Sequence, residues 1–401
     1  MRRIAITGYG TINALGVGAG AFERGLRDGR CAIGPLTVLP PEGFRSQVAA
    51  EVKEVIPPAA IPGTIARRAS RTSKLALIAA DEALRMTRLD TGDRERMGVV
   101  LGTTTGGLAR GEECYRRAKR ERGRAPRISG WFETPVSVAA DTLAQTFACY
   151  GPRLTVSTAC SSSANALGIA ADWIRSGRAE RVLCGGSDSL CWMTYSGFNV
   201  LQALDIVACR PFDRRRAGLT LGEGSAMFVL EDWERASSRS AAIAAELVSY
   251  GVSADAHHLT QPRPDGAGAM SAMRRALREG GVEAEEIDYV NAHGTGTPLN
   301  DVAETKAIKA VFGTRAYGIP VTSTKSMIGH CLAAGGAIEA LASVLAMRGN
   351  FVPPTATLEE PDPECDLDYV PRTSRPATLH TVLSNSYGFG GNNTSVVLRA
   401  V

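Results

Sequence analysis

The stretch Leu154-Thr-Val-Ser-Thr-Ala-Cys160-Ser-Ser-Ser-Ala-Asn-Ala-Leu-Gly168 contains the residues that decide the fold. In its first part, apolar and polar residues alternate with period two and several are β-branched, which predicts a strand. The small residues after Cys160 predict a helix. A cysteine at this junction lies at a helix N-terminus, where unpaired N–H groups and the helix dipole favour a thiolate. Because the thiolate is the nucleophilic form, we expect Cys160 to attack a carbonyl carbon. The alternative is a free cysteine that only packs in the core.

Two of the five histidines follow strand-like runs and lie in loops of small residues. They are His293, in Asn291-Ala-His293-Gly-Thr-Gly-Thr297, and His330, in Ser323-Thr-Lys325-Ser-Met-Ile-Gly-His330. Small neighbours leave room for a ligand and let the backbone approach it closely. One cysteine and two distant histidines, all at strand ends, predict acyl-transfer chemistry. The other histidines, His257, His258 and His380, are expected to be structural or solvated.

Composition excludes several classes of protein. The chain has 401 residues, 44% of them hydrophobic, so it can bury a large core. Nine cysteines without C-x-x-C pairs predict a reduced, cytoplasmic protein without a disulfide framework or a metal site. A net charge of +4 is too small to indicate nucleic-acid binding. Since no signal peptide or membrane-spanning run is recognised, we expect no membrane association.

Sequence similarities within the chain recur in the same order. Val156-Ser-Thr-Ala-Cys160 matches Thr322-Ser-Thr-Lys-Ser326, and Leu221-Gly-Glu-Gly-Ser-Ala matches Phe389-Gly-Gly-Asn-Asn-Thr, at offsets of 166 and 168 residues. The repetition predicts two related β/α halves. We place the boundary in a charged stretch, so that residues 1–239 carry the nucleophile and residues 240–401 carry both histidines.

The chain resembles the elongating β-ketoacyl-(acyl carrier protein) synthases in four ordered motifs. These are the segments around Cys160, His293 and His330, and the terminal Asn385-Ser-Tyr-Gly-Phe389-Gly-Gly-Asn-Asn. The resemblance implies an α/β, thiolase-like duplicated fold of five layers, αβαβα. It implies no cofactor. The expected partners are an acyl carrier protein and a second chain, either an identical copy or a cysteine-less subunit that determines chain length.

The resemblance also implies the roles of the site residues. Cys160 accepts an acyl chain from a carrier-protein thioester, and a malonyl-carrier thioester then loses carbon dioxide and attacks the acyl group. His293 and His330 donate hydrogen bonds to the thioester oxygen, on which negative charge develops during decarboxylation. The backbone N–H groups of Cys160 and Phe389 form a second oxyanion hole.

Charged residues near the histidines have two possible interpretations. Glu339 lies in the apolar helical run 333–347, where a lone carboxylate is costly unless it is paired. By resemblance, Glu339 and Lys325 form a buried ion pair that orients His330, whereas the alternative places Glu339 on a narrow exposed strip. Asp301 and Glu304 match the family's acidic pair, although a solvated helix would explain them nearly as well.

Three basic clusters are candidates for carrier-protein docking, because carrier proteins are strongly acidic. They include Arg67 and Arg68, the run Arg116–Arg124, and Arg214–Arg216. Such clusters are usually only solvated surfaces. We predict that Arg67, Arg68 and Arg210 dock the carrier protein.

The chain departs from the family pattern where the acyl chain is expected to bind. Thr105 replaces a bulky aliphatic residue and Leu219 replaces an aromatic ring, so these two residues and Phe389 are predicted to line the substrate pocket. Tyr387 stands where phenylalanine is common, and Trp131-Phe-Glu-Thr-Pro-Val is unusual for a dimer-contact region. These departures leave fatty-acid, polyketide and polyene elongation all possible.

Three other classes of protein remain as alternatives. A cysteine hydrolase or transferase could use Cys160 and His293 but would not need His330 or Lys325. A non-decarboxylating thiolase normally has a second cysteine near the C-terminus, and residues 385–393 contain none. A chain-length subunit would lack the nucleophile that this chain retains.

Overall fold

The computed structural model describes residues 2–121 and 128–401. Its 11-stranded main sheet contains two five-stranded units and the short strand β2, which pairs with β1. In the described residues the two units pair with each other between β1 and β9, through Ala5–Glu246 and Ile6–Ala245. The strands of the first unit are β1 (Ile4–Asn13), β5 (Gly98–Gly102), β6 (Arg153–Val156), β7 (Arg181–Asp188) and β8 (Gly224–Asp232). Those of the second are β9 (Ala245–Ala254), β10 (Tyr289–Asn291), β11 (Val321–Thr322), β14 (Thr381–Gly388) and β15 (Asn392–Arg399).

The two units have the same topology. The spatial order is β6-β5-β7-β8-β1 in the first and β11-β10-β14-β15-β9 in the second, so each places its strands in the order 3-2-4-5-1. In this spatial order, the first three strands of each unit are parallel to one another. The fourth strand is antiparallel to the third, and the fifth is antiparallel to the fourth. The repeated strand order agrees with the sequence similarity between the two halves. The boundary at residue 239 stays a prediction.

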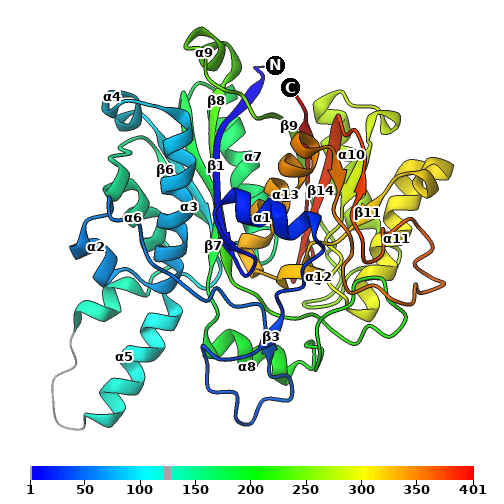
Figure 1. The fold of residues 1–401 in the computed structure, drawn as a ribbon, viewed down its shortest axis with the longest axis horizontal. Coiled ribbons are helices and arrows are strands. Elements are labelled where there is room, and N and C mark those ends of the chain that lie inside the picture. Colours follow the sequence, from blue (N-terminus) through cyan, green and yellow to red (C-terminus); the bar gives the residue numbers. More distant parts are fainter. Residues whose placement is uncertain (1, 122–127) are drawn as a thin grey trace.

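Helices form three layers around the two sheet units (Figure 1). On the outer side of the first unit lie α3 (Arg71–Thr87) and α6 (Val138–Phe147), and on the outer side of the second lie α10 (Ala267–Gly280) and α11 (Pro298–Phe312). Between the units lie α7 (Ser162–Arg175) and α13 (Gly335–Gly349), which contact each other and strands of both units. The predicted five-layered αβαβα arrangement is therefore confirmed.

Small residues let the central layer fit between two sheets. A side chain at Gly168 of α7 would come within 2.3 Å of the Tyr250 ring on β9, and one at Gly336 of α13 would come within 2.9 Å of Ala164. The run Leu332–Gly349 is long and apolar enough to cross a membrane, but 89% of it is buried inside the protein. It is the core helix of the central layer, and its burial against sheets explains why it is apolar on every face.

The remaining elements connect these layers, and α5 extends away from the layered body (Figure 1). They are β2 (Gly16–Val17), α1 (Ala19–Arg27), β3 (Gly34–Pro35), β4 (Val48–Ala49), α2 (Gly63–Arg68), α4 (Thr91–Glu95), α5 (Leu108–Arg120), η1 (Ile128–Glu133), α8 (Trp192–Val200), α9 (Trp233–Ser238), η2 (Ala284–Glu286), η3 (Gly313–Gly318), α12 (Lys325–Ile328), η4 (Leu332–Ala334), β12 (Phe351–Val352) and β13 (Arg375–Pro376).

Candidate active site

Cys160 lies on a tight turn between β6 and α7. Ala159, just before it, has φ 52°, a left-handed conformation that is uncommon for a residue other than glycine. The turn is closed by hydrogen bonds from Thr158 N to Ser162 Oγ, at 2.9 Å, and from Ser161 Oγ to Thr158 O, at 2.8 Å. Local side-chain bonds thus hold the strained backbone that presents the thiol.

Burial opposes the predicted thiolate form of Cys160. Burial raises the pKa of the Cys160 thiol to about 11, although the Lys325 charge and a hydrogen bond from the Phe389 N–H both lower it. The cause is desolvation: Cys160 is only 8% exposed, and the cost of moving the thiolate out of water exceeds the stabilisation that these neighbours give it. The contact with the Phe389 N–H places one of the two predicted oxyanion-hole donors beside the sulfur.

The structure brings both predicted histidines to the cysteine. His293 follows β10 and His330 follows α12, and their ring centroids are 5.4 Å apart with the planes at 85°. Both line the same cavity as Cys160, which has an empty volume of about 540 Å³ including the part open to solvent. The convergence of these three residues from both halves could not be derived from their spacing in the sequence.

Both imidazoles are buried and are held neutral. Burial lowers the pKa of His293 and of His330 well below the usual value, and the Lys325 charge lowers both further. In the described part of the chain, neither ring nitrogen of His330 nor Nδ1 of His293 has a hydrogen-bond partner. Because neutral imidazole carries one N–H donor and one acceptor, each ring can donate to a ligand in the cavity.

Lys325 and Glu339 form a buried ion pair between α12 and α13. The Lys325 ammonium contacts the Glu339 carboxylate, and the side chains are 2% and 3% exposed. Glu339 also accepts a hydrogen bond from Ser386 Oγ at 3.5 Å. The exposed-strip alternative for Glu339 is therefore wrong. The pair does not hold the His330 ring by a hydrogen bond; its effect on both histidines is the Lys325 charge, which opposes their protonation.

Asp301 and Glu304 hold the loop that carries His293. Glu304 accepts hydrogen bonds from the His293 and Gly294 N–H groups, at 2.9 and 2.8 Å, and Asp301 accepts one from Thr295 N at 3.1 Å. Both carboxylates are buried, so the solvated-helix alternative is wrong. Burial raises the pKa of Glu304 to about 7 despite its backbone hydrogen bonds.

The cavity includes residues that sequence reasoning did not assign. Phe198 of α8 stacks on Phe389 with ring centroids 5.5 Å apart, and both line the cavity. The loop after β9 covers another side, where Gly390 N donates to Leu259 O at 2.8 Å. Thr295 and Thr297 also line the cavity, and the Gly-Thr-Gly-Thr motif could have indicated them. Nothing local in the sequence points to Phe198.

Two of the three predicted pocket residues line the cavity at Cys160. Leu219 and Phe389 line the cavity at Cys160, as predicted, but Thr105 does not. Thr105 is buried, and its hydroxyl donates to the Asp188 carboxylate at 2.8 Å. This bond satisfies the buried Thr105 hydroxyl, since a buried polar group must find a partner.

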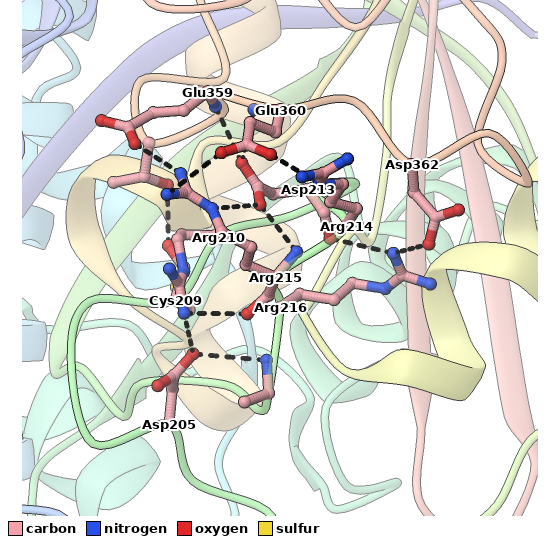
Figure 2. Close-up of polar contacts among 12 residues, drawn as sticks. Asp205, Cys209, Arg210, Asp213, Arg214, Arg215, Arg216, Glu359, Glu360 and Asp362 are labelled. Carbon is pink, nitrogen blue, oxygen red and sulfur yellow. Dashed lines mark hydrogen bonds and ion pairs between the residues drawn. The ribbon is translucent and has the colours of Figure 1, made fainter.

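Arg210 and the cluster Arg214–Arg216 are already paired with acidic residues (Figure 2). Their partners are Asp205 for Arg210, Glu360 for Arg214, Asp213 and Glu359 for Arg215, and Asp362 for Arg216. These pairs join the loop after α8 to the loop after β12, and the Arg216 side chain is only 5% exposed. The positive charges of Arg214–Arg216 are therefore already paired with carboxylates, and Arg210 is already paired with Asp205.

The other two basic clusters differ from this one. Arg67 and Arg68 are exposed in the last turn of α2. In the run Arg116–Arg124, Arg116 and Arg117 pair with Glu112 and Glu121, and Arg122 and Arg124 lie outside the described residues. In the described ranges 2–121 and 128–401, no group of three or more His, Cys, Asp or Glu side chains is arranged to hold a metal ion.

Comparison with protein families gives two matches in sequence order. The family described as "Beta-ketoacyl synthase, N-terminal domain" matches residues 1–236, and "Beta-ketoacyl synthase, C-terminal domain" matches residues 244–359. Among curated proteins, "Nodulation protein E" of Rhizobium meliloti (strain 1021) is 41% identical over 100% of both chains. The 3-oxoacyl-acyl-carrier-protein synthase 2 of Synechocystis sp. is 38% identical over 99% of this chain and 98% of its own.

Solved structures agree with this assignment. "The ishigamide ketosynthase/chain length factor" superposes with a TM-score of 0.95 at 35% identity, covering 100% of this chain and 99% of that one. A type II polyketide ketosynthase in complex with its acyl-carrier protein, bound to the hexaketide, has a TM-score of 0.91 at 32% identity, with coverage of 100% and 99%. The chain belongs to the β-ketoacyl synthase family of acyl-transferring condensing enzymes.

Proposed function

We propose that this protein elongates an acyl chain by decarboxylative condensation with a malonyl-carrier thioester. The observation that carries the proposal is the cavity in which Cys160, His293 and His330 meet. A hydrolase would need only a cysteine and one histidine, whereas two neutral imidazoles beside one thiol match a reaction that develops charge on a second thioester.

The first half-reaction is thioester exchange at Cys160. A bond forms between the Cys160 sulfur and the acyl carbon, the bond to the carrier's thiol breaks, and the proton of Cys160 passes to that leaving thiol. The tetrahedral oxyanion accepts hydrogen bonds from the backbone N–H groups of Cys160 and Phe389.

The second half-reaction uses both histidines. The malonyl carbon–carbon bond breaks and releases carbon dioxide, and the electron pair is stabilised as an enolate whose oxygen accepts the His293 and His330 N–H groups. The carbanion carbon then bonds to the acyl carbon, and Cys160 leaves as the thiolate and regains a proton. Neutral rings can donate these hydrogen bonds without carrying a charge that would hold the malonyl carboxylate.

Mass spectrometry of the reacting proteins tests this function. Incubation with an acyl-loaded and a malonyl-loaded carrier protein is expected to add the acyl mass to Cys160 and then give a β-ketoacyl carrier longer by two carbons, with carbon dioxide released. Cys160→Ala is the control and should form neither product. Free fatty acid without consumption of malonyl groups would show a hydrolase instead. A panel of acyl chain lengths in the same assay distinguishes fatty-acid from polyketide-like substrates.

We propose that the enzyme works as a dimer in the cytoplasm, with an identical copy or a chain-length-factor-like subunit. Strand β6 is an open edge of the sheet, with Leu154 39% exposed, and the nearby η1 exposes Phe132 at 67%. Exposed strand edges and aromatic side chains are features of surfaces that pair with another chain. Native mass spectrometry of the purified protein tests this, and a monomer that condenses at full rate would refute it.

A further inference from the structure

Asp188 is a buried carboxylate with an unusual set of partners. It ends β7 and is 0% exposed. It accepts hydrogen bonds from five donor groups: Thr103 Oγ1 at 2.7 Å, Thr104 N at 3.1 Å, Thr105 N at 2.9 Å, Thr105 Oγ1 at 2.8 Å and Ala333 N at 2.9 Å. Among the residues that the structure describes, no lysine or arginine forms an ion pair with it.

These contacts favour the ionised form of the Asp188 carboxylate. Three of the five donors are backbone N–H groups, which cannot reverse their role, and the two oxygens of an ionised carboxylate act only as acceptors. Burial raises the pKa of Asp188, and the hydrogen bonds oppose that rise. A buried charge without a counter-ion is costly to keep, so a role beyond filling space is expected.

The partners of Asp188 belong to both halves of the protein. Residues 103–105 form the loop after β5 in the first half, whereas Ala333 belongs to η4 in the second half, three residues after His330. A neighbouring hydrogen bond also joins the second half to the first: Ala337 N on α13 donates to Ser163 Oγ on α7, at 2.8 Å. The turn that presents Cys160 is closed by its own bonds and does not depend on Asp188.

We propose that Asp188 is a positioning residue that fixes the His330 segment against the first half, and thereby sets where the His330 ring stands relative to Cys160. This inference rests on the condensing function proposed above. His330 has no hydrogen bond from its ring to the protein, so its place depends on its backbone. That backbone is held on one side by the bond from His330 N to Thr220 O, at 2.7 Å, and on the other by Ala333 and Asp188.

Asp188→Asn tests the proposal, because it keeps the shape and places an amide N–H₂ against N–H donors. Acylation of Cys160 should stay within about threefold of wild type. The kcat for malonyl-carrier decarboxylation should fall about 10- to 100-fold with little change in KM, since a displacement of about 1 Å can cost 10²-fold. Ser225→Ala, which removes a buried hydroxyl bonded to Gly186 O on the same sheet, is the matched control and should leave both rates unchanged.

A second measurement reports the charge. Asp188 raises the pKa of the Cys160 thiol, so the pH dependence of Cys160 alkylation should shift to lower pH in Asp188→Asn and stay unchanged in Ser225→Ala. If Asp188→Asn does not fold, Thr103→Val with Thr105→Val removes the two hydroxyl donors and should show the same selective loss, smaller in size. Equal losses in both half-reactions, or no loss, would overturn the proposal. A wild-type protein that does not acylate Cys160 at all would instead refute the condensing function.

Discussion

At the scale of single residues, burial favours the uncharged forms of the proposed nucleophile, Cys160, and of the two proposed donors, His293 and His330. Cys160 is buried, and its thiol is stabilised against ionisation, while His293 and His330 are stabilised against protonation. Desolvation is the largest cause in all three cases, and it disfavours the charged form of each group. These three residues are therefore uncharged near neutral pH.

Alkylation kinetics should reveal the state of the thiol. With a pKa of about 11, the rate of Cys160 alkylation by iodoacetamide should rise roughly tenfold per pH unit from pH 7 to pH 10. Peptide-resolved mass spectrometry separates Cys160 from the exposed Cys31. A rate that reaches its plateau below pH 9 would show that the helix terminus outweighs burial.

Substitution of either histidine should separate the half-reactions. His293→Ala and His330→Ala are each expected to reduce condensation about 10²–10³-fold, the usual loss for one oxyanion donor. Acylation of Cys160 should remain measurable, because its oxyanion hole is formed by backbone N–H groups. Rapid-quench measurement of acyl-enzyme and product checks this, and near-wild-type condensation in both variants would contradict the two-histidine site.

At the scale of elements, α12 and α13 are joined by the Lys325–Glu339 pair. Removing one partner leaves an unpaired buried charge, so Lys325→Met should lower the free energy of unfolding by about 3–5 kcal/mol. Lys325→Met with Glu339→Leu should recover much of that loss, because no buried charge remains. Urea unfolding at pH 7.5 measures both, and Lys309→Met, which breaks an exposed pair with Asp366, is the control. A double variant no more stable than the single one would contradict this account.

The same pair should control histidine ionisation. Since the Lys325 charge lowers the pKa of His293 and His330, Lys325→Met with Glu339→Leu should raise both values. NMR titration of the imidazole signals in the folded double variant measures the shift. No movement would show that burial alone keeps the rings neutral.

At the scale of the whole molecule, the predicted docking residues differ in how much free positive charge they carry. Arg210 and Arg214–Arg216 are paired with acidic residues, so they offer little free positive charge, whereas Arg67 and Arg68 on α2 are exposed. Arg67→Glu with Arg68→Glu should raise the KM for an acyl-carrier protein about tenfold or more and weaken its salt dependence.

The control for docking uses both substrate and protein. The Arg67/Arg68 variant should process a small pantetheine thioester at the wild-type rate, because its cavity is intact. Arg274→Glu with Arg278→Glu makes the same charge change on exposed positions of α10 and should leave the KM unaltered. Equal effects of the two double variants would indicate only a general effect of net charge.

The sequence by itself predicted the duplicated fold and the three residues that meet in the cavity, Cys160, His293 and His330. The turn at Cys160, the loops at His293 and His330, and the apolar run of α13 are local patterns, and local periodicity follows directly from the order of residues. The similarity between the halves predicted two units, and the strand order 3-2-4-5-1 occurs twice.

Only the tertiary structure decided the environment of each group. Desolvation and hydrogen-bond partners come from segments far apart in the chain, so neither the pKa of Cys160 nor the burial of Asp301 and Glu304 could be read from neighbouring residues. The same holds for Thr105, whose hydroxyl bonds to Asp188, 83 positions later. A residue's type limits the chemistry that it can perform, and the distant groups that surround it after folding decide its charge and its partners.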